Sequence, residues 1–371
     1  YNNGPPIRSD GAGYHIWTYA IIKGDVSFSW YEGNPFEVSL HQPDPNVSRF
    51  TCKYPAGVAL LRLPVMVFVT APAHNGLPYS LGEHRACLAV GVLMLVLTVA
   101  LGLDTCYRLG VSPGGANATV FLITFGGGLF HYGTYDASFS HIFSACLVAA
   151  LIWCAVRAVE SRRSLPLLSV ALLVAGLLLV RMTNMLAVGF WGLACLLLAG
   201  ETVCRSPNFR LRVAVGGALG LALGLGITLS LNYAMFHRFT LHTYPGESFV
   251  WNDPKMLLVL FGQHYGALRL FPVLGITVIA GLLSRRSRGA AVVFIGMLAT
   301  YTVLYGHWWT WNLGCGFGHR GFVDVVPFAV PVLAVALASL NRFVSGAIVL
   351  LGSLAMFYTI VMMGYYWIAL P

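Results

Sequence analysis

The sequence predicts an all-α polytopic membrane protein with about ten transmembrane helices. Of the 371 residues, 57% are hydrophobic and 9% are charged, whereas about 25% are charged in an ordinary soluble domain. The mean hydropathy is +0.75, and the apolar stretches run for about twenty residues with almost no charge. This composition excludes a soluble enzyme, a disordered chain and a disulfide-stapled secreted domain. A membrane β-barrel is excluded because its strands are alternating segments of about ten residues.

The polar segment 1–84 is predicted to form an outer-face loop with interfacial helices, and a further N-terminal span is expected to precede it. Residues 56–72 are apolar, but the run is short and contains Arg62 and Pro64, so we expect an interfacial or re-entrant helix there. Residues 85–371 form the predicted transmembrane domain. Its spans are expected at 85–105, 114–133, 138–157, 165–181, 185–203, 212–233, 266–284, 289–306, 322–340 and 343–367.

Basic residues gather in five of the loops between these spans. The residues are Arg108; Arg157, Arg162 and Arg163; Arg205, Arg210 and Arg212; Arg285, Arg286 and Arg288; and Arg342. All five loops fall on one side, which the positive-inside rule assigns to the cytoplasm. The net charge of +9 is therefore explained by the basic loops of a membrane protein, and no nucleic-acid partner is expected. The segments predicted to face outside are 1–84, 134–137, 182–184, 234–265 and 307–321.

Two aspartates in the outer segments are candidate catalytic residues. Asp10 precedes an amphipathic stretch, 14–23, which we expect to form a helix along the membrane surface. Asp136 lies in a very short outer turn, where a carboxylate is costly unless it is paired or solvated. The alternative for both residues is helix capping, with Asp136 capping a helix that starts at Ala137.

Several cations of the outer segments are candidate anion-binding residues. Lys53 precedes Pro55 at the start of the 56–72 run, where it can meet a phosphate or a lipid headgroup. Arg181 and Asn184 interrupt an otherwise apolar stretch. An arginine in this position needs an anion or a set of carbonyls, unless it snorkels to the headgroups.

The Gly-rich stretch 305–322 contains three tryptophans and ends near His319 and Arg320. Tryptophans alone would indicate a belt at the membrane interface. The glycines also let backbone N–H groups approach an anion, and Arg320 offers a fork of donors where the next helix begins. We therefore predict a phosphate site here. Loop 234–265 suits sugar binding or loop packing, and its histidines lack the spacing of a metal site.

These residues, in this order, resemble the GT-C superfamily of integral-membrane glycosyltransferases. The nearest likeness is to the dolichyl-phosphate-mannose protein mannosyltransferase (PMT-like) group and its bacterial relatives. The stretch Asp10-Gly11-Ala12-Gly13-Tyr14 matches the position of the catalytic acid, Lys53-Tyr54-Pro55-Ala56-Gly57 looks like the proline motif, and Tyr135-Asp136 looks like the second acid. Arg181 and Arg320 fall where such proteins place positive charge.

The resemblance covers most of the chain by topology, but the motifs are short and depart from the family pattern. Gly11 stands where a second acid often follows, and the proline motif has one proline instead of two. No large C-terminal soluble domain follows the last span, so the resemblance does not indicate whether the acceptor is a glycan, a lipid or a protein.

The resemblance implies a donor in which a polyprenyl phosphate carries the sugar, surrounded by membrane lipids. Asp10 would be the general base that deprotonates an acceptor hydroxyl, which then attacks the anomeric carbon and inverts it. Asp136 would orient the acceptor or the base. The residues expected to bind substrate and stabilise the departing phosphate are Tyr14, Lys53, Arg181, Asn184, His319 and Arg320. Because arginine holds a leaving monophosphate, no metal and no other cofactor is expected.

The implied location is the bacterial inner membrane, with the site facing outside and a role in the cell envelope. Two other classes remain open: a non-catalytic membrane subunit or scaffold, and a transporter or flippase of lipid-linked sugars. The absence of a sequence repeat and of acidic residues in the middle of the spans argues against the transporter. Cys52 and Cys315 both lie outside in this topology, and their spacing does not decide whether they form a disulfide.

Overall fold

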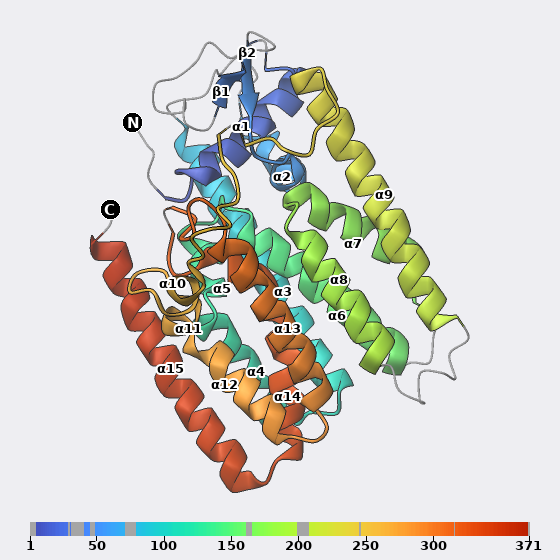
Figure 1. Cartoon of the computed structure of the whole chain (residues 1–371), viewed down its shortest axis with the longest axis vertical. Coiled ribbons are helices and arrows are strands. Elements are labelled where there is room, and N and C mark those ends of the chain that lie inside the picture. The colour runs from blue at the N-terminus through green and yellow to red at the C-terminus, as the bar shows by residue number, and fades with distance from the viewer. Residues whose placement is uncertain are drawn as a thin grey trace.

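The computed structural model describes residues 5–28, 30, 41–44, 49–70, 79–160, 165–198, 208–244, 246–314 and 316–369. Within these residues the chain is a bundle of long helices with a group of short elements across one end (Figure 1). The elements are α1 (Asp10–Lys23), β1 (His41–Asp44), β2 (Arg49–Cys52), α2 (Gly57–Met66), α3 (Leu81–Arg108), α4 (Pro113–Gly126), α5 (Leu129–Thr134), α6 (His141–Glu160), α7 (Leu167–Val180), α8 (Asn184–Leu198), α9 (Phe209–Phe236), α10 (Met256–Phe261), α11 (Ala267–Leu270), α12 (Pro272–Leu283), α13 (Arg288–Gly306), the 3-10 helix η1 (Arg320–Phe328), α14 (Ala329–Ser339) and α15 (Arg342–Ala369).

The described residues contain six helices that are long and apolar enough to cross a membrane. These are α3, α6, α9, α13, the continuous η1–α14 segment and α15. Helical structure also lies in each of the other four predicted runs, where the helices are shorter. The chain is therefore an integral membrane protein, and the count of ten spans stays a prediction.

The structure divides some of the predicted runs. The run 114–133 is split between α4 and α5, because Gly128 has a φ of +82°, which glycine adopts without steric cost. The run 322–340 begins as the 3-10 helix η1 and only then becomes α14. The predicted all-α fold also gains one small antiparallel hairpin, β1–β2, in the outer segment.

The helix α1 differs from the sequence prediction. The predicted helix is present, with Asp10 at its N-terminal end, but every residue from Gly11 to Ala20 is buried, so its expected amphipathic character is wrong. The reason is close packing on two sides: a Cβ at Gly11 would lie 1.7 Å from Ser138 Oγ, and one at Gly13 would lie 2.1 Å from the Tyr54 ring. The missing side chains let the rest of the molecule enclose α1.

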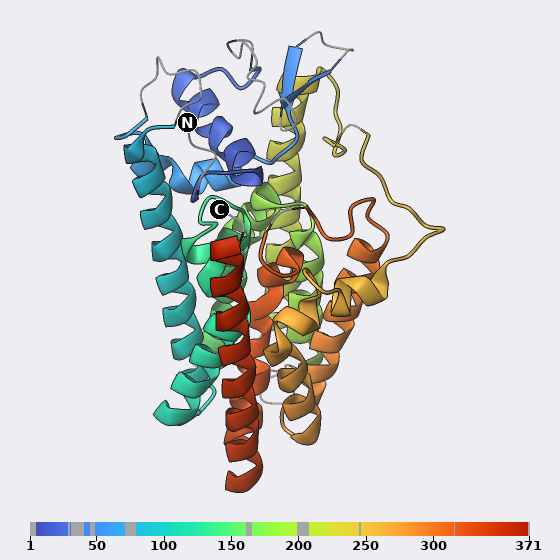
Figure 2. The same cartoon turned by 90° about the vertical axis from the view of Figure 1, so that its left-hand side faces the viewer.

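The helix α2 lies across the end of the bundle rather than along it (Figure 2). It is one of the shorter apolar helices, in line with the predicted interfacial or re-entrant helix. It starts against the end of α7, since a Cβ at Gly57 would lie 2.3 Å from the carbonyl carbon of Leu179. This contact brings the Lys53–Pro55 stretch close to the turn that carries Arg181.

Three of the five predicted basic loops contact one another in the structure. Arg108, at the end of α3, pairs with Glu160 at the end of α6, with Nη1 2.7 Å from Oε2. Arg212 Nη1 donates to the carbonyl oxygen of Leu165, joining the second and third loops. Arg162, Arg163 and Arg205 lie outside the described residues. The described parts of these three loops therefore gather at one end of the bundle, as the topology requires.

Candidate functional site

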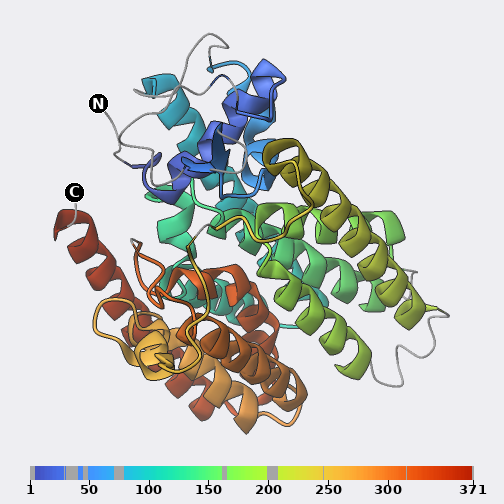
Figure 3. The same ribbon diagram turned by 45° about the horizontal axis from the view of Figure 1, so that its top comes forward.

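A cavity of about 490 Å³ lies where the N-terminal elements meet the ends of the helices. Its walls come from the start of α1, residues 53–55, the α7–α8 turn, the loop after α9, and the segment 304–320. The loop after α9 runs from beside the N-terminal elements toward α10 (Figure 3). The lining residues used below are Asp10, Tyr14, Lys53, Tyr54, His141, Arg181, Thr183, Tyr244, Glu247, Tyr305, Trp308, Trp309 and Arg320.

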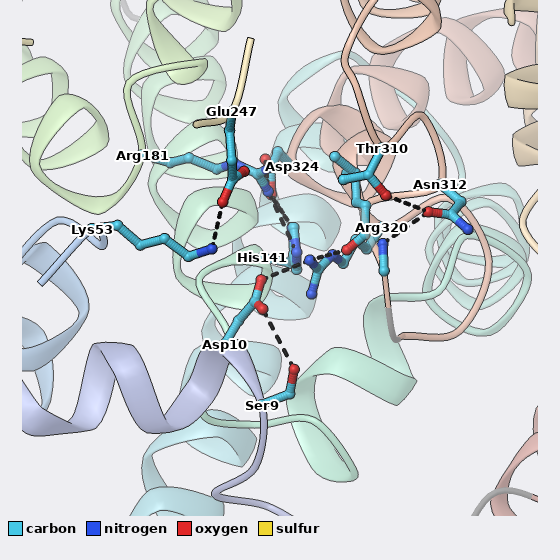
Figure 4. A network of polar contacts seen from close by, with 12 residues as sticks. Ser9, Asp10, Lys53, His141, Arg181, Glu247, Thr310, Asn312, Arg320 and Asp324 are labelled. Carbon is cyan, nitrogen blue, oxygen red and sulfur yellow. Dashed lines mark hydrogen bonds and ion pairs between the residues drawn. The ribbon is translucent and has the colours of Figure 1, made fainter. Parts of the chain in front are cut away.

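Asp10 is the first residue of α1, and its carboxylate faces Arg320 across the cavity (Figure 4). Asp10 Oδ2 lies 2.6 Å from Arg320 Nη2, and the two side chains are 22% and 8% exposed. Ser9, not Asp10, holds the N-cap position of α1. The capping alternative for Asp10 is therefore not what the structure shows.

Arg320 begins η1 and is held by the Gly-rich segment before it. Its Nη2 donates to the carbonyl oxygen of Leu313, and its guanidinium lies 5.3 Å from the centre of the Phe139 ring. Gly316 and Gly318 have φ values of +134° and +64°, a conformation that favours glycine. The glycines predicted to approach an anion thus also fold the loop that positions Arg320.

A second ion pair stands at another wall of the cavity. Lys53 Nζ lies 2.6 Å from Glu247 Oε1, and Glu247 Oε2 accepts a hydrogen bond of 2.9 Å from Trp309 Nε1. The Lys53 ammonium is 5.5 Å from the ring centres of both Tyr54 and Tyr244. Aromatic faces beside hydrogen-bonding groups are typical of carbohydrate-binding walls, because they pack against the C–H faces of a sugar while its hydroxyls find partners.

A further charged group of the cavity, beside these two ion pairs, is Arg181, at the C-terminal end of α7. Its Nη1 lies 3.4 Å from Asp324 Oδ2, and the other carboxylate oxygen of Asp324 lies 2.8 Å from His141 Nδ1. Asp324 is fully buried, whereas His141 and Arg181 reach the cavity. The cavity therefore holds Arg181 with its charge only loosely matched by a carboxylate.

The tyrosine predicted to bind substrate also lines the cavity. Tyr14 packs against Tyr54, with ring centres 4.8 Å apart and the two rings tilted by 53°. Burial raises the pKa of Tyr14 to about 12, and the Asp10 carboxylate acts in the same direction. The hydroxyl therefore stays protonated at neutral pH and can donate a hydrogen bond to an anion in the cavity.

Three predicted site residues do not line this cavity. Asp136 is fully buried, and its Oδ1 accepts from Arg8 Nε at 2.7 Å. Its Oδ2 accepts from Arg8 Nη2 at 3.1 Å and lies 2.9 Å from His131 Nε2. No helix starts at Ala137, since α6 begins at His141. The expected cap there is wrong because residues 135–140 form turns that close over Asp136.

Asn184 and His319 are the other two. Asn184 Nδ2 donates to Ser144 Oγ at 2.8 Å and to the Leu177 carbonyl, so it ties α8 to α6 and α7. His319 Nε2 lies 2.8 Å from the Trp311 carbonyl oxygen, and burial lowers the pKa of His319 to about 3. A neutral His319 donating to Trp311 closes the Gly-rich loop behind Arg320.

His141 was not among the predicted site residues, and Glu247 and Tyr305 were not singled out from the longer stretches that contain them. A usable signal existed for His141: it stands beside the predicted outer end of a span, as Asp324 does in another span. The pairing of these two residues needs the fold, since 183 positions separate them.

In the part of the chain that the structure describes, no group of three or more His, Cys, Asp or Glu side chains is arranged to hold a metal ion. Cys52 is fully buried. Cys315, the other member of the possible disulfide, lies outside the described residues.

Comparison with known proteins gives one structural likeness. No protein-family model and no curated protein matches the chain. The fold is similar to a crystal structure of the Archaeoglobus fulgidus oligosaccharyltransferase, tethered with an acceptor peptide containing the NVT sequon via a disulfide bond. The TM-score is 0.46 and the identity 12%, over 95% of this chain and 55% of the other. The chain thus spans about half the length of that protein.

Proposed function

We propose that this protein is a membrane glycosyltransferase of the GT-C type, which moves a sugar from a polyprenyl-phosphate donor to an acceptor hydroxyl. One observation carries the proposal: a single cavity at the end of a membrane bundle joins Asp10, Lys53, Arg181 and Arg320 from four distant segments. A carboxylate for proton transfer and cations for a phosphate are the two needs of such a reaction.

In this proposal Asp10 is the general base. It takes the proton of the acceptor hydroxyl while the hydroxyl oxygen bonds to the anomeric carbon. The bond from that carbon to the phosphate oxygen breaks, and the electron pair leaves with the polyprenyl phosphate. Attack from the side opposite the leaving group inverts the anomeric carbon. Arg181 and Arg320, with Lys53 and the Tyr14 hydroxyl, stabilise the charge that develops on the phosphate.

Donor binding has a second effect in this proposal, because it changes the ion pair between Asp10 and Arg320. At 2.6 Å this contact holds the carboxylate on the guanidinium of Arg320. A donor phosphate competes for the same guanidinium and so releases Asp10 toward the acceptor. The proposal therefore includes an order of events, with donor binding before proton transfer.

The proposed setting follows from the charges of the loops. The five basic loops are assigned to the cytoplasm, so the cavity opens on the outer side of a bacterial inner membrane, where cell-envelope glycans, lipids or proteins could be acceptors. The PMT-like group and its bacterial relatives remain the family likeness that the sequence motifs favour. Arginine and lysine at the phosphate replace the charge that a metal would supply, so no metal is part of the proposal.

The test is a transfer assay with the purified chain and labelled polyprenyl-phosphate sugars. We expect Asp10→Asn to lower the transfer rate by about 100- to 10,000-fold, the usual contribution of a general base. Asp253→Asn is the matched control, because Asp253 is 63% exposed and lies outside the cavity. Transfer retained in Asp10→Asn would remove Asp10 from the role of base. Binding of the donor without transfer by the wild type would instead favour a flippase or a scaffold.

A further inference from the structure

The floor of the cavity carries polar groups that the proposed transfer does not use. His141, the first residue of α6, lines the cavity and has a side chain that is only 2% exposed. Thr183, in the α7–α8 turn, and Tyr305, near the end of α13, line the same cavity. All three come from segments that also carry or contact Arg181.

The neighbour of His141 fixes which ring nitrogen carries a proton. His141 Nδ1 lies 2.8 Å from Oδ1 of the fully buried Asp324. An ionised carboxylate can only accept hydrogen bonds, so Nδ1 is the protonated nitrogen. In the neutral imidazole, Nε2 then holds a lone pair, which accepts a hydrogen bond in the plane of the ring.

Arg181 does not occupy that lone pair. Its Nη1 lies 3.1 Å from His141 Nδ1 and 3.4 Å from Nε2. Cε1 lies between the two ring nitrogens, so an atom in the ring plane at both of these distances would overlap the ring. The guanidinium nitrogen therefore lies over the face of the ring. A cation in this place favours the neutral imidazole, because a second positive charge beside it is unfavourable. His141 Nε2 is therefore a hydrogen-bond acceptor that lies beside the positive charge of Arg181.

The two hydroxyls beside it are buried and lie close to each other. Tyr305 OH and Thr183 Oγ1 have no third partner within the described part of the chain, so each keeps hydrogen-bonding capacity beyond its contact with the other. Tyr305 as a residue is only 3% exposed. A buried polar group left in this way costs about 1–3 kcal/mol, so a ligand that supplies partners gains affinity. Each hydroxyl can both donate and accept.

We propose that His141, Thr183 and Tyr305 form a subsite for the hydroxyl groups of a carbohydrate substrate, with His141 Nε2 accepting from one of them. The inference rests on the proposed glycosyl transfer and names the part of the substrate that meets these residues. A sugar hydroxyl can both donate and accept a hydrogen bond. It can therefore donate to His141 Nε2, which only accepts, and bond in either direction with the hydroxyls of Thr183 and Tyr305. The hydroxyls could belong to the donor sugar or to a carbohydrate acceptor.

The sharpest variants are Tyr305→Phe and Thr183→Val, since each removes a hydroxyl with no described partner beyond the other one and keeps the shape of the side chain. We expect an unchanged or raised melting temperature and a loss of about 3- to 10-fold in kcat/KM, the worth of one hydrogen bond. His141→Phe should lose more, and a thermal melt shows whether it folds. Tyr265→Phe, outside the cavity, is the matched control.

Binding measurements separate the two sources of the hydroxyls. The probes are short-chain polyprenyl-phosphate hexoses and pentoses, with bare polyprenyl phosphate as the reference. A donor-sugar subsite weakens binding of the sugar-bearing lipids in the variants and leaves the bare phosphate unchanged. An acceptor subsite leaves both unchanged and raises the KM for the acceptor.

The same measurements distinguish failure of this inference from failure of the proposed function. Unaltered binding and kinetics in both hydroxyl variants, with an active wild type, would overturn the subsite alone. A wild type that binds sugar-bearing lipids through these hydroxyls but transfers nothing would support the subsite and reject the transferase. A wild type that prefers no sugar-bearing lipid over the bare phosphate would overturn both.

Discussion

Two aspartates of the outer segments have opposite surroundings. Asp10 is 22% exposed in the cavity and meets one cation, so a ligand can reach it and compete for its partner. Asp136 is fully buried and is held by Arg8 and His131, with Tyr366 bonded to the same arginine. A carboxylate sealed in this way stabilises the packing of the N-terminal segment against α15.

Asp136 should therefore be a determinant of stability. Burial alone would raise the pKa of its carboxyl, but His131 and Arg8 outweigh burial and lower the pKa to about 2. Removal of one member of a buried pair costs about 3–5 kcal/mol, because the other charge is left buried. We expect Asp136→Asn to lower the melting temperature in detergent strongly at pH 7, measured by circular dichroism.

The sign of the pH dependence follows from the same shift. The pKa in the folded state lies below the value of about 3.9 for an unfolded aspartate. The carboxylate thus stabilises the protein above about pH 4, and the contribution is lost as the pH falls toward 2. Asp136→Asn should flatten this part of the stability curve, whereas the exposed control Asp253→Asn should not. Equal curves for wild type and Asp136→Asn would contradict the structural role.

At the scale of elements, small residues decide how closely two helices approach. Gly216, Gly220 and Gly224 lie on one side of α9 at four-residue spacing, facing α7. A Cβ at Gly220 would lie 2.6 Å from the carbonyl oxygen of Ala171 and from Val174 Cβ. In a membrane, such close packing replaces the hydrophobic drive that holds helices together in water. The end of α7 carries Arg181, so this contact also positions the cavity wall.

Gly220→Val should force α9 away from α7 and destabilise the protein by about 1–3 kcal/mol, the usual cost of overpacking. Gly217→Val is the matched control, since a Cβ at Gly217 meets nothing within 4 Å. Both variants make the same change in one helix, so helix propensity cancels in the comparison. Equal melting temperatures for the two variants in detergent would show that the α7–α9 contact is not tight.

At the scale of the whole molecule, the charged groups are sorted to the two ends of the bundle. The basic loops meet at one end through contacts such as Arg108–Glu160, and the cavity with its ion pairs lies at the other. Charges can stay near the ends of membrane helices at low cost, whereas the centre of the bilayer excludes them. The orientation of the protein thus decides which side of the membrane the cavity faces.

Cysteine labelling in intact cells tests this orientation. Asp253→Cys, in the loop after α9, should react with a membrane-impermeant maleimide, whereas Arg286→Cys, between α12 and α13, should react only after permeabilisation. The described cysteines are buried, which keeps the background low, and Cys204 and Cys315 are replaced by serine. The reverse labelling pattern would place the cavity on the cytoplasmic side.

The sequence by itself determined the class of the protein and the ends at which its polar residues lie. Apolar runs report burial in lipid directly, and the spacing of basic residues orders the loops. Asp10, Lys53, Arg181 and Arg320 were predicted as site residues on this basis, and the structure places all four at one cavity. Their roles in the reaction stay predictions.

Only the tertiary structure decided which polar residues share a site. Asp10 pairs with Arg320 and Asp136 with Arg8, although the sequence made both aspartates candidate catalytic residues. His141 contacts Asp324, which is 183 positions away in the sequence, and no local motif identifies either residue. Such pairings depend on how helix ends meet in space, which is set by close packing at residues such as Gly57 and Gly220. A local pattern reports burial and periodicity, but it does not report these distant contacts.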